Sequence, residues 1–266
     1  MKAMVLAAGL GTRLRPLTND RPKALVEVGG RTMLELTLAR LKGFGVREAI
    51  VNTHHHAEMI EEYLLANDNF GMRIEVSRED ALLDTGGGLK KAAWFFAGQP
   101  DQAHGAERNG PNASAEQNSP DEPFLVHNVD VLSTIDLAAM IRAHQQSGAL
   151  ATLAVQQRNT SRCLLFDGEG QLAGRRSGLD GEPLWIGPDH AAAALAFCGI
   201  HIISPRIFAE MKQEGAFSII DAYVELARKG ERVMAFRADG AHWRDLGRPE
   251  SVAKAAEEIA ARMYSD

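Results

Sequence analysis

Residues 3–18 read AMVLAAGLGTRLRPLT, an apolar run that leads into a glycine-rich loop. The six apolar residues at its start predict a buried strand. Further along the chain, Leu34, Leu38 and Leu41 recur at helical spacing. We therefore expect the chain to begin with a strand, a loop and an amphipathic helix.

The same alternation of strand and helix continues through the first half of the chain. Strand patterns at 49–52, 72–77 and 124–132 each precede a helical pattern, around 56–66, 87–96 and 135–147 respectively. Repeated strand and helix pairs predict a parallel sheet covered on both faces. The expected fold class is α/β, a single Rossmann-like, mostly parallel mixed sheet with helices on both faces.

Strand patterns also continue after residue 149, where glycine-rich turns shorten the links between them. We expect this half to complete the sheet, and the segment 249–263 to form a C-terminal helix that starts near Pro249. Residues 98–122 are polar and rich in Gly, Pro, Asn and Ser, which predicts a mobile surface insertion. No chemistry is assigned to this insertion, and a lid role stays open.

The composition excludes several classes of protein. With 266 residues, of which 45% are hydrophobic and 24% charged, the chain matches a soluble globular protein with a substantial core. No apolar stretch approaches the roughly 20 residues of a membrane helix. The start has glycine and arginine where a signal peptide would stay apolar, so we expect a cytoplasmic protein. The net charge of −6 argues against a nucleic-acid surface, which needs clustered Lys and Arg.

The loop after the first predicted strand is suited to a polyphosphate. Glycines let backbone N–H groups approach a ligand closely, and consecutive N–H groups form an anion-binding concavity. Arg13 and Lys23 add full charges, and a guanidinium can hold two phosphate oxygens at once. A tight turn without a ligand remains the alternative for the glycines alone. The loop is not a dinucleotide fingerprint, because Leu14 replaces the third glycine, and no G-K-[ST] follows to make a P-loop.

The stretch from Gly9 to Thr18, followed by Pro22 and Lys23, resembles the signature of sugar-1-phosphate nucleotidyltransferases. The resemblance covers nearly the whole chain except 98–122. Within the family it points to short N-acetylmuramate-1-phosphate uridylyltransferases and mannose-1-phosphate guanylyltransferases. It implies the nucleotide-diphospho-sugar transferase fold and an enzyme that joins a nucleoside triphosphate to a sugar 1-phosphate with release of pyrophosphate.

The resemblance also implies roles for individual residues. Arg13, Lys23 and Asp130 would be catalytic in an in-line attack on the α-phosphate. The residues expected to contact the nucleotide are Leu6, Ala7, Gly9, Gly11, Thr12, Arg13, Lys23, Thr85, Gly86, Gly87 and Asn128.

Two aspartates are the candidates for a metal site. Asp130 lies in the apolar run 124–132, and the carboxyl end of such a strand is where ligands bind in open α/β sheets. Asp245 lies just before the last predicted helix. A lone aspartate is more often a cap or turn residue, but the resemblance implies that the two share Mg²⁺, which takes one or two carboxylates. The chain departs from the family pattern at Val129, where a small residue usually stands.

Base and sugar contacts rest on weaker patterns. Residues 83–92 read LDTGGGLKKA, which places three glycines just before a predicted helix. A surface without side chains suits a planar base or ribose, while a flexible turn is the alternative. The resemblance favours the nucleotide contact. It also assigns the sugar to Gly199, Arg158 and Arg162, and two further arginines could meet an anionic sugar: Arg175 and Arg176.

We expect one domain over 1–266, with a nucleotide-binding half at 1–148 and a sugar-binding half with the C-terminal helix at 149–266. The expected partners are a nucleoside triphosphate and a sugar 1-phosphate, without nucleic acid or membrane, bound by a monomer or homodimer. Two alternatives stay open. A regulatory protein that binds a nucleotide sugar without turnover would not need both carboxylates. A nicotinamide-dependent oxidoreductase would need an acidic residue after the second strand, where Asn52 stands instead.

Overall fold

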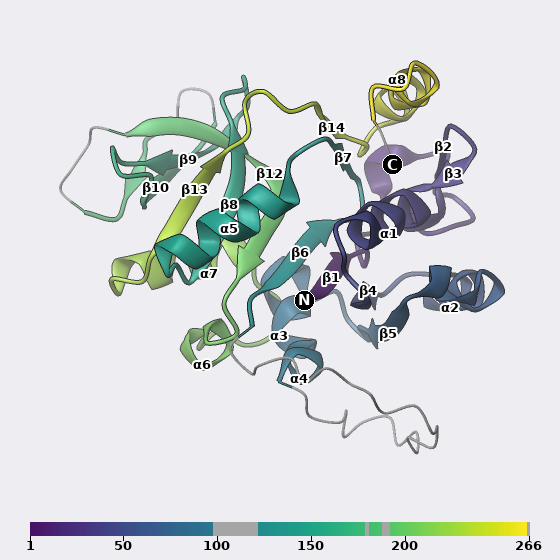
Figure 1. The fold of residues 1–266 in the computed structure, drawn as a ribbon, viewed down its shortest axis with the longest axis horizontal. Coiled ribbons are helices and arrows are strands. Elements are labelled where there is room, and N and C mark those ends of the chain that lie inside the picture. The colour runs from purple at the N-terminus through teal and green to yellow at the C-terminus, as the bar shows by residue number, and fades with distance from the viewer. Residues whose placement is uncertain (98–121, 179–180, 188–191, 265–266) are drawn as a thin grey trace.

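The computed structural model describes residues 1–97, 122–178, 181–187 and 192–264. The predicted insertion at 98–122 therefore lies outside the described residues, except for Glu122. In the described part, a ten-stranded mixed sheet is accompanied by two small two-stranded sheets. Helices lie on both faces of the large sheet (Figure 1).

The first half of the chain forms the parallel part of the sheet. Its strands, in spatial order, are β5 (Arg73–Arg78), β4 (Glu48–Thr53), β1 (Lys2–Leu6) and β6 (Phe124–Asn128). Each neighbouring pair among them is parallel. Because parallel strands end at the same edge of a sheet, the loops that follow these strands converge there.

The second half is organised around the long strand β12 (Ala193–Ile203), which pairs antiparallel with β6 and so joins the two halves. The remaining strands of the large sheet are β8 (Ala151–Gln156), β9 (Arg162–Phe166), β10 (Leu172–Ser177), β11 (Leu184–Trp185) and β13 (Val233–Arg237). Strands β8 and β9 both pair antiparallel with β12. The mixed α/β sheet is thus confirmed, and the part predicted to bind the nucleotide is parallel.

Side chains that alternate along the strands fill two cores, one on each face of the sheet. On β1, Ala3 and Val5 point into one core, whereas Met4 and Leu6 point into the other. The first core is covered by α1 (Met33–Gly43), α2 (Ala57–Ala66), α5 (Leu137–Ser147) and α8 (Pro249–Ala260). The second is covered by α3 (Asp84–Lys91), α4 (Ala93–Phe96), α6 (Ile207–Glu210) and α7 (Ile219–Arg228). The predicted helices on both faces are confirmed.

The C-terminal helix α8 begins at Pro249, as predicted, and ends before the predicted limit at 263. Proline suits the first helical position because an N–H there would have no helical acceptor. Val252 and Ala255 are buried in the first core. The helix packs beside a hairpin formed by β2 (Glu27–Val28) and β3 (Arg31–Thr32) (Figure 1).

Two predicted boundaries are wrong. The apolar run 124–132 is not one strand, because β6 ends at Asn128 and a turn follows. The next strand, β7 (Val131–Ser133), pairs with β14 (Trp243–Asp245) in a separate sheet. The three glycines at 86–88 lie inside α3 rather than before it. Close packing explains their presence there, since a Cβ on Gly87 would lie 2.3 Å from Gly215 O.

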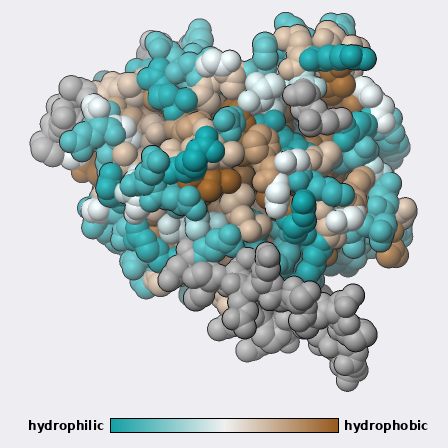
Figure 2. All heavy atoms as spheres, viewed as in Figure 1, coloured by the Kyte–Doolittle hydropathy of each residue, from teal (hydrophilic) through white to brown (hydrophobic). Residues whose placement is uncertain are grey.

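Buried and exposed residues are distributed as in a globular protein. Cys163 and Cys198 are both buried and free. Within the described ranges, none of the helices has both the length and the apolar composition needed to span a bilayer. On the face shown in Figure 2, hydrophobic residues gather near the middle and hydrophilic ones cover most of the periphery.

Candidate active site

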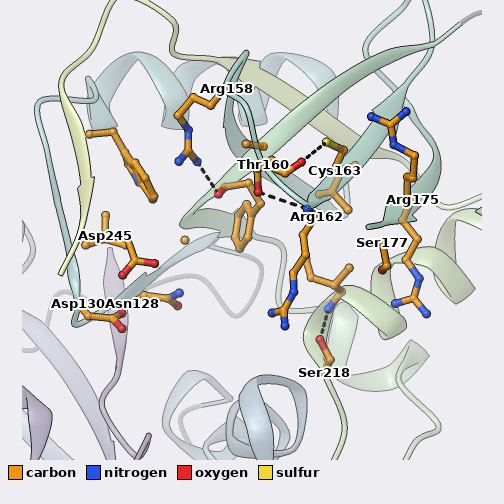
Figure 3. A pocket seen from close by; sticks show the side chains of 18 of the residues that line it. Asn128, Asp130, Arg158, Thr160, Arg162, Cys163, Arg175, Ser177, Ser218 and Asp245 are labelled. Carbon is orange, nitrogen blue, oxygen red and sulfur yellow. Dashed lines mark hydrogen bonds between the residues drawn. The ribbon is translucent and has the colours of Figure 1, made fainter. Parts of the chain in front are cut away.

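Two cavities lie near the edge where the parallel strands end. The smaller has a volume of about 390 Å³. Several predicted nucleotide-binding residues line it: Leu6, Gly9, Lys23, Thr85 and Asn128. The larger, of about 670 Å³, continues along the antiparallel strands of the second half (Figure 3). Asn128 and Asp130 line both cavities, so the two spaces meet at these side chains.

The glycine-rich loop folds closely over Lys23. A Cβ on Gly9 would lie 3.2 Å from Lys23 Nζ. Gly11 has a φ of +64°, and a Cβ there would lie 2.9 Å from Thr18 Cγ2. Gly11 therefore needs to be glycine for the loop to keep its shape, and a side chain at Gly9 would press on the end of Lys23. The fold of the loop leaves Lys23 Nζ 3.0 Å from Asp130 Oδ2, with both side chains largely buried.

The Asp130 carboxylate stays ionised at the junction of the cavities. Burial by itself raises its pKa, but the charge and hydrogen bond of Lys23, with a smaller contribution from Arg13, lower the pKa below its usual value. An ionised carboxylate is the form that binds a cation. Val129, where the chain departs from the family pattern, is buried in the core and lines neither cavity.

Asp245 reaches the same point from the other end of the chain. Strand β14 pairs antiparallel with β7, which places Asp245 opposite Val131, the residue after Asp130. Leu246 N donates a hydrogen bond of 2.8 Å to Asp130 O, which ties the two segments together. Both carboxylates line the larger cavity, at the same end of it (Figure 3). The structure thus brings together the two aspartates that the sequence analysis paired.

Arg13 lies beside Asp245 and lines the larger cavity rather than the smaller one. A Cβ on Gly247 would lie 2.7 Å from Arg13 Nη2 and 2.6 Å from Asp245 Oδ1. Glycine at this position therefore leaves room for both groups. Within the described part of the chain no carboxylate forms an ion pair with Arg13, so its guanidinium remains available to bind an anion.

The donor atoms at the junction fit a hard divalent cation. Outside the gaps in the described ranges, no group of three His, Cys, Asp or Glu residues is placed to hold a metal. A structural zinc site would need such a group. Asp130 and Asp245 form a pair of carboxylates, a number that would suffice for Mg²⁺ if water and substrate phosphates supplied its other ligands.

Two buried polar residues of the smaller cavity were missed by the sequence analysis. Asn52 accepts a hydrogen bond of 2.7 Å from Ala7 N and donates one of 2.7 Å to Glu79 Oε1. The other carboxylate oxygen of Glu79 accepts from Leu83 N at 2.9 Å. These bonds join the glycine-rich loop, the end of β4 and the start of α3 into one wall. The available signal was position in the sequence, because Asn52 ends the strand pattern 49–52 and Glu79 directly follows β5.

The structure shows a packing role for two glycines that were assigned to the nucleotide. Gly86 N and Gly87 N donate to Phe217 O at 2.9 and 3.3 Å. A Cβ on Gly86 would lie 2.4 Å from the Phe217 ring, so the absence of side chains seats α3 against this segment. A direct nucleotide contact stays a prediction for every residue assigned to the nucleotide, and several of them do not line the smaller cavity: Ala7, Gly11, Thr12, Gly86 and Gly87.

Arg158 lines the larger cavity, but the protein itself engages its guanidinium. The Arg158 Cζ lies 3.4 Å from the centroid of the Trp243 ring, and Nη2 donates to Phe197 O at 3.0 Å. Trp243, which the sequence analysis did not single out, donates from Nε1 to Cys198 O at 2.8 Å. Arg158 therefore supports the wall beside β14, and its contact with a sugar stays a prediction.

Gly199 shapes the junction as well as the larger cavity. Its φ is +73°, and a Cβ there would lie 2.8 Å from Asn128 Nδ2. The pairing of β12 with β8 is irregular between Phe197 and His201, on either side of this glycine. Gly199 thus allows the Asn128 amide to sit against β12, and its predicted contact with the sugar remains compatible with its place in the wall.

The far end of the larger cavity collects further arginines. Figure 3 shows Arg175 on the side opposite the two aspartates, with Arg162 between them. Arg175 pairs with Asp221. No carboxylate in the described ranges pairs with Arg162 or Arg176, and the Arg176 Nε is buried without a hydrogen-bond partner there. Positive charge without a partner is costly to desolvate, so this end of the cavity is suited to an anionic group.

Comparison with known proteins agrees with this geometry. The family model described as nucleotidyl transferase matches residues 2–163. An N-acetylmuramate α-1-phosphate uridylyltransferase of Caulobacter vibrioides is 32% identical, over 97% of this chain and 96% of that protein. The chain belongs to the sugar-1-phosphate nucleotidyltransferase family. A mannose-1-phosphate guanylyltransferase of Mycobacterium tuberculosis is 26% identical to this transferase, over 97% of this chain and 64% of that protein.

Solved structures share the fold of this transferase. A putative glucose-1-phosphate thymidylyltransferase from Bacillus anthracis matches it with a TM-score of 0.75 and 17% identity, over 100% of this chain and 97% of that chain. At that identity the likeness concerns the fold alone. The alignments with three further curated relatives cover 36%, 51% and 38% of their lengths. The predicted family, enzyme class and fold are confirmed.

The family model covers only part of the site. Its match to this transferase includes the glycine-rich loop, Lys23, Asp130 and Arg158, but ends at Cys163. Asp245 lies beyond that match, and the pairing of β14 with β7 brings it next to Val131. The candidate active site thus includes a segment outside the region that the family model matches.

Proposed function

We propose that this transferase condenses UTP with a sugar 1-phosphate that carries a further acidic group, releasing pyrophosphate and leaving a UDP-sugar. The observation that carries the proposal is the meeting of the two cavities at Asn128 and Asp130. A triphosphate in the smaller cavity and a sugar 1-phosphate in the larger would have their phosphates at this shared point. Such an arrangement suits in-line attack of one phosphate on the other.

Mg²⁺ is the cofactor that we propose, with Asp130 and Asp245 as its protein ligands. When bound, it would neutralise charge on the phosphates of both substrates and lower their mutual repulsion. The choice of metal rests on the oxygen donors and on the two-carboxylate set at the junction.

Lys23 and Arg13 supply positive charge from two sides of the junction. Lys23 lines the smaller cavity and lies at hydrogen-bond distance from Asp130, while Arg13 lines the larger cavity beside Asp245. Fixed charges of this kind stabilise the transition state of an anionic reaction more than its separated reactants. The sugar phosphate oxygen would form a bond to the α-phosphorus as the bond to pyrophosphate breaks, so no nucleophile from the protein is needed.

The arginines at the far end of the larger cavity support an acidic sugar. Arg162 and Arg176 have no carboxylate partner in the described ranges, and a guanidinium binds a carboxylate through paired hydrogen bonds. The similar Caulobacter vibrioides protein is named for N-acetylmuramate 1-phosphate, a sugar that bears a lactyl carboxylate. We therefore propose N-acetylmuramate 1-phosphate as the sugar and UTP as the nucleotide.

A panel assay of pyrophosphate release tests the proposal. Each of UTP, GTP, CTP, ATP and dTTP is combined with the 1-phosphates of N-acetylmuramate, N-acetylglucosamine, mannose and glucose, with and without Mg²⁺. The expected result is Mg²⁺-dependent release that is highest with UTP and N-acetylmuramate 1-phosphate. A preference for neutral sugars would overturn the acidic-sugar assignment, and binding of a nucleotide sugar without release from any pair would favour the regulatory alternative.

A further inference from the structure

Asp245 lies on β14, a short strand with few neighbouring strands. The strand has three residues and pairs with β7 in a two-stranded sheet outside the large one. Successive side chains of a strand point to opposite faces. Trp243 and Asp245 both line the larger cavity, and Arg244 contacts Glu258 of α8 instead. The position of Asp245 therefore depends on what holds each face of this strand.

The face away from the cavity is held by an ion pair with the C-terminal helix. Arg244 Nε donates to Glu258 Oε2 at 2.7 Å, and Nη2 donates to Oε1 of the same carboxylate. The two side chains are 23% and 13% exposed, so the pair is partly withdrawn from water. Tyr264 donates a third hydrogen bond to Glu258 Oε2, at 3.1 Å. A forked contact of this kind fixes direction as well as distance.

The helix that carries Glu258 is anchored independently of the site. Val252 and Ala255 are buried in the first core, and a Cβ on Gly29 of the neighbouring hairpin would lie 3.5 Å from Ile259. The helix can therefore act as a fixed support. Contacts beyond a metal's direct ligands orient those ligands and change metal affinity when they are removed.

We propose that Glu258 is a positioning residue for the metal site: it holds Arg244 and thereby sets where Asp245 stands opposite Asp130. This inference rests on the proposed function, because it takes Asp245 as a ligand of Mg²⁺. It adds to the site a residue of the C-terminal helix that touches neither cavity. The predicted effect is on metal-assisted binding, with little change in the binding of nucleotide alone.

The test compares full-length wild type with Glu258→Gln, which keeps the shape of the side chain and removes its charge. The affinity for α,β-methylene-UTP, which cannot be cleaved at the α-phosphate, is measured by calorimetry with and without Mn²⁺. The ratio of the two affinities measures how strongly metal binding and nucleotide binding are coupled on the protein. We expect that ratio to fall about tenfold in Glu258→Gln, with the metal-free affinity unchanged.

Three further variants make the result decisive. Glu231→Gln breaks a comparable ion pair, Arg206 to Glu231 at 2.6 Å, away from both cavities, and should leave the ratio as in wild type. Arg244→Lys keeps the charge but loses the forked contact, so it should lower the ratio in the same direction if Glu258→Gln proves unstable. Asp245→Asn should remove most of the increase in affinity for α,β-methylene-UTP that Mn²⁺ produces.

The outcomes separate this inference from the proposed function. If Asp245→Asn loses the gain while Glu258→Gln and Arg244→Lys both behave like Glu231→Gln, the positioning role of Glu258 is overturned and the metal site stands. If Asp245→Asn keeps the full gain, the metal assignment itself fails. Thermal unfolding of each variant checks that a lower ratio does not arise from loss of the folded protein.

Discussion

The two cavities of this transferase satisfy their polar groups in opposite ways. In the smaller cavity, Asn52 and Glu79 use their buried polar atoms on each other and on backbone N–H groups. In the larger cavity, Arg162 and Arg176 have no carboxylate partner in the described part of the chain. Asn52 and Glu79 in the wall of the smaller cavity thus have hydrogen-bond partners without a ligand. Arg162 and Arg176 in the wall of the larger cavity carry positive charge that a substrate could neutralise.

This difference indicates how the two substrates would be recognised. A wall closed by its own hydrogen bonds holds a fixed shape, which suits a nucleotide held by backbone and planar contacts. Guanidinium groups without partners select for charge, which suits discrimination among sugars. The contrast leads to five predictions, beginning with the point that both cavities share.

The largest effect is expected at the junction. Asp130→Asn should lower kcat for pyrophosphate release on the order of 10³-fold, because the ionised carboxylate is the proposed metal ligand and lines both cavities. Steady-state assays at saturating UTP and sugar 1-phosphate measure the effect. Turnover within tenfold of wild type would remove Asp130 from the mechanism.

The next effect tests the charge on the nucleotide side. Lys23→Met should lower kcat about 10²-fold, since a fixed positive group near the reacting phosphates is lost. The pKa of Asp130 should rise toward its usual value at the same time, because Lys23 holds it down. Carboxylate titration by NMR checks this shift, and an unchanged Asp130 signal would contradict the close pair.

The packing of α3, whose start belongs to the wall of the smaller cavity, should be intolerant of added volume. Gly87→Ala should destabilise the fold by about 2 kcal/mol, because its Cβ would lie 2.3 Å from Gly215 O. Gly43→Ala is the matched control in α1, where a Cβ meets nothing within 4 Å, and it should be neutral or slightly stabilising. Urea unfolding measures both variants, and equal midpoints would show that the glycine is not needed for packing.

The arginines without a carboxylate partner in the described ranges should affect how the larger cavity selects its sugar substrate. Arg176→Met should lower kcat/KM for an acidic sugar 1-phosphate about tenfold and leave the KM for UTP unchanged. Arg175→Met should have a smaller effect, because Arg175 is already paired with Asp221. A neutral sugar 1-phosphate serves as the control substrate, and an equal loss with both sugars would contradict recognition of the acidic group.

The fold should become less stable in acid because of two histidines on the paired strands β6 and β12, which join the two halves. Burial lowers the pKa of His127 on β6 to about 4 and that of His201 on β12 to about 3. The unfolded chain takes up protons near pH 6.5 while the folded chain does not, so stability is full above that pH and falls as the pH drops toward 4. The slope should be about 1 kcal/mol per pH unit for each histidine. Urea unfolding from pH 7 to pH 5 measures it, and His201→Phe should make the slope shallower.

The nucleotide side of the fold could be predicted from the sequence because its information is local. The apolar run at 3–8, the glycines that follow and Lys23 lie within one short stretch, so the strand and the loop after it could be predicted without knowledge of distant segments. The alternation of strands and helices likewise placed Asp130 near the edge where parallel strands end. Its exact setting was missed, because the turn after Asn128 depends on the pairing of β7 with β14.

The sequence by itself determined the α/β class, and it predicted a phosphate-binding role for the first loop and named the candidate pair of aspartates. The tertiary structure decided that Asp245 stands beside Asp130, that Arg158 is held by Trp243, and that Arg162 and Arg176 are left without a carboxylate partner in the described ranges. The physical reason is that charge and backbone freedom are properties of single residues. Whether a charge is already neutralised depends on which distant segment folds against it.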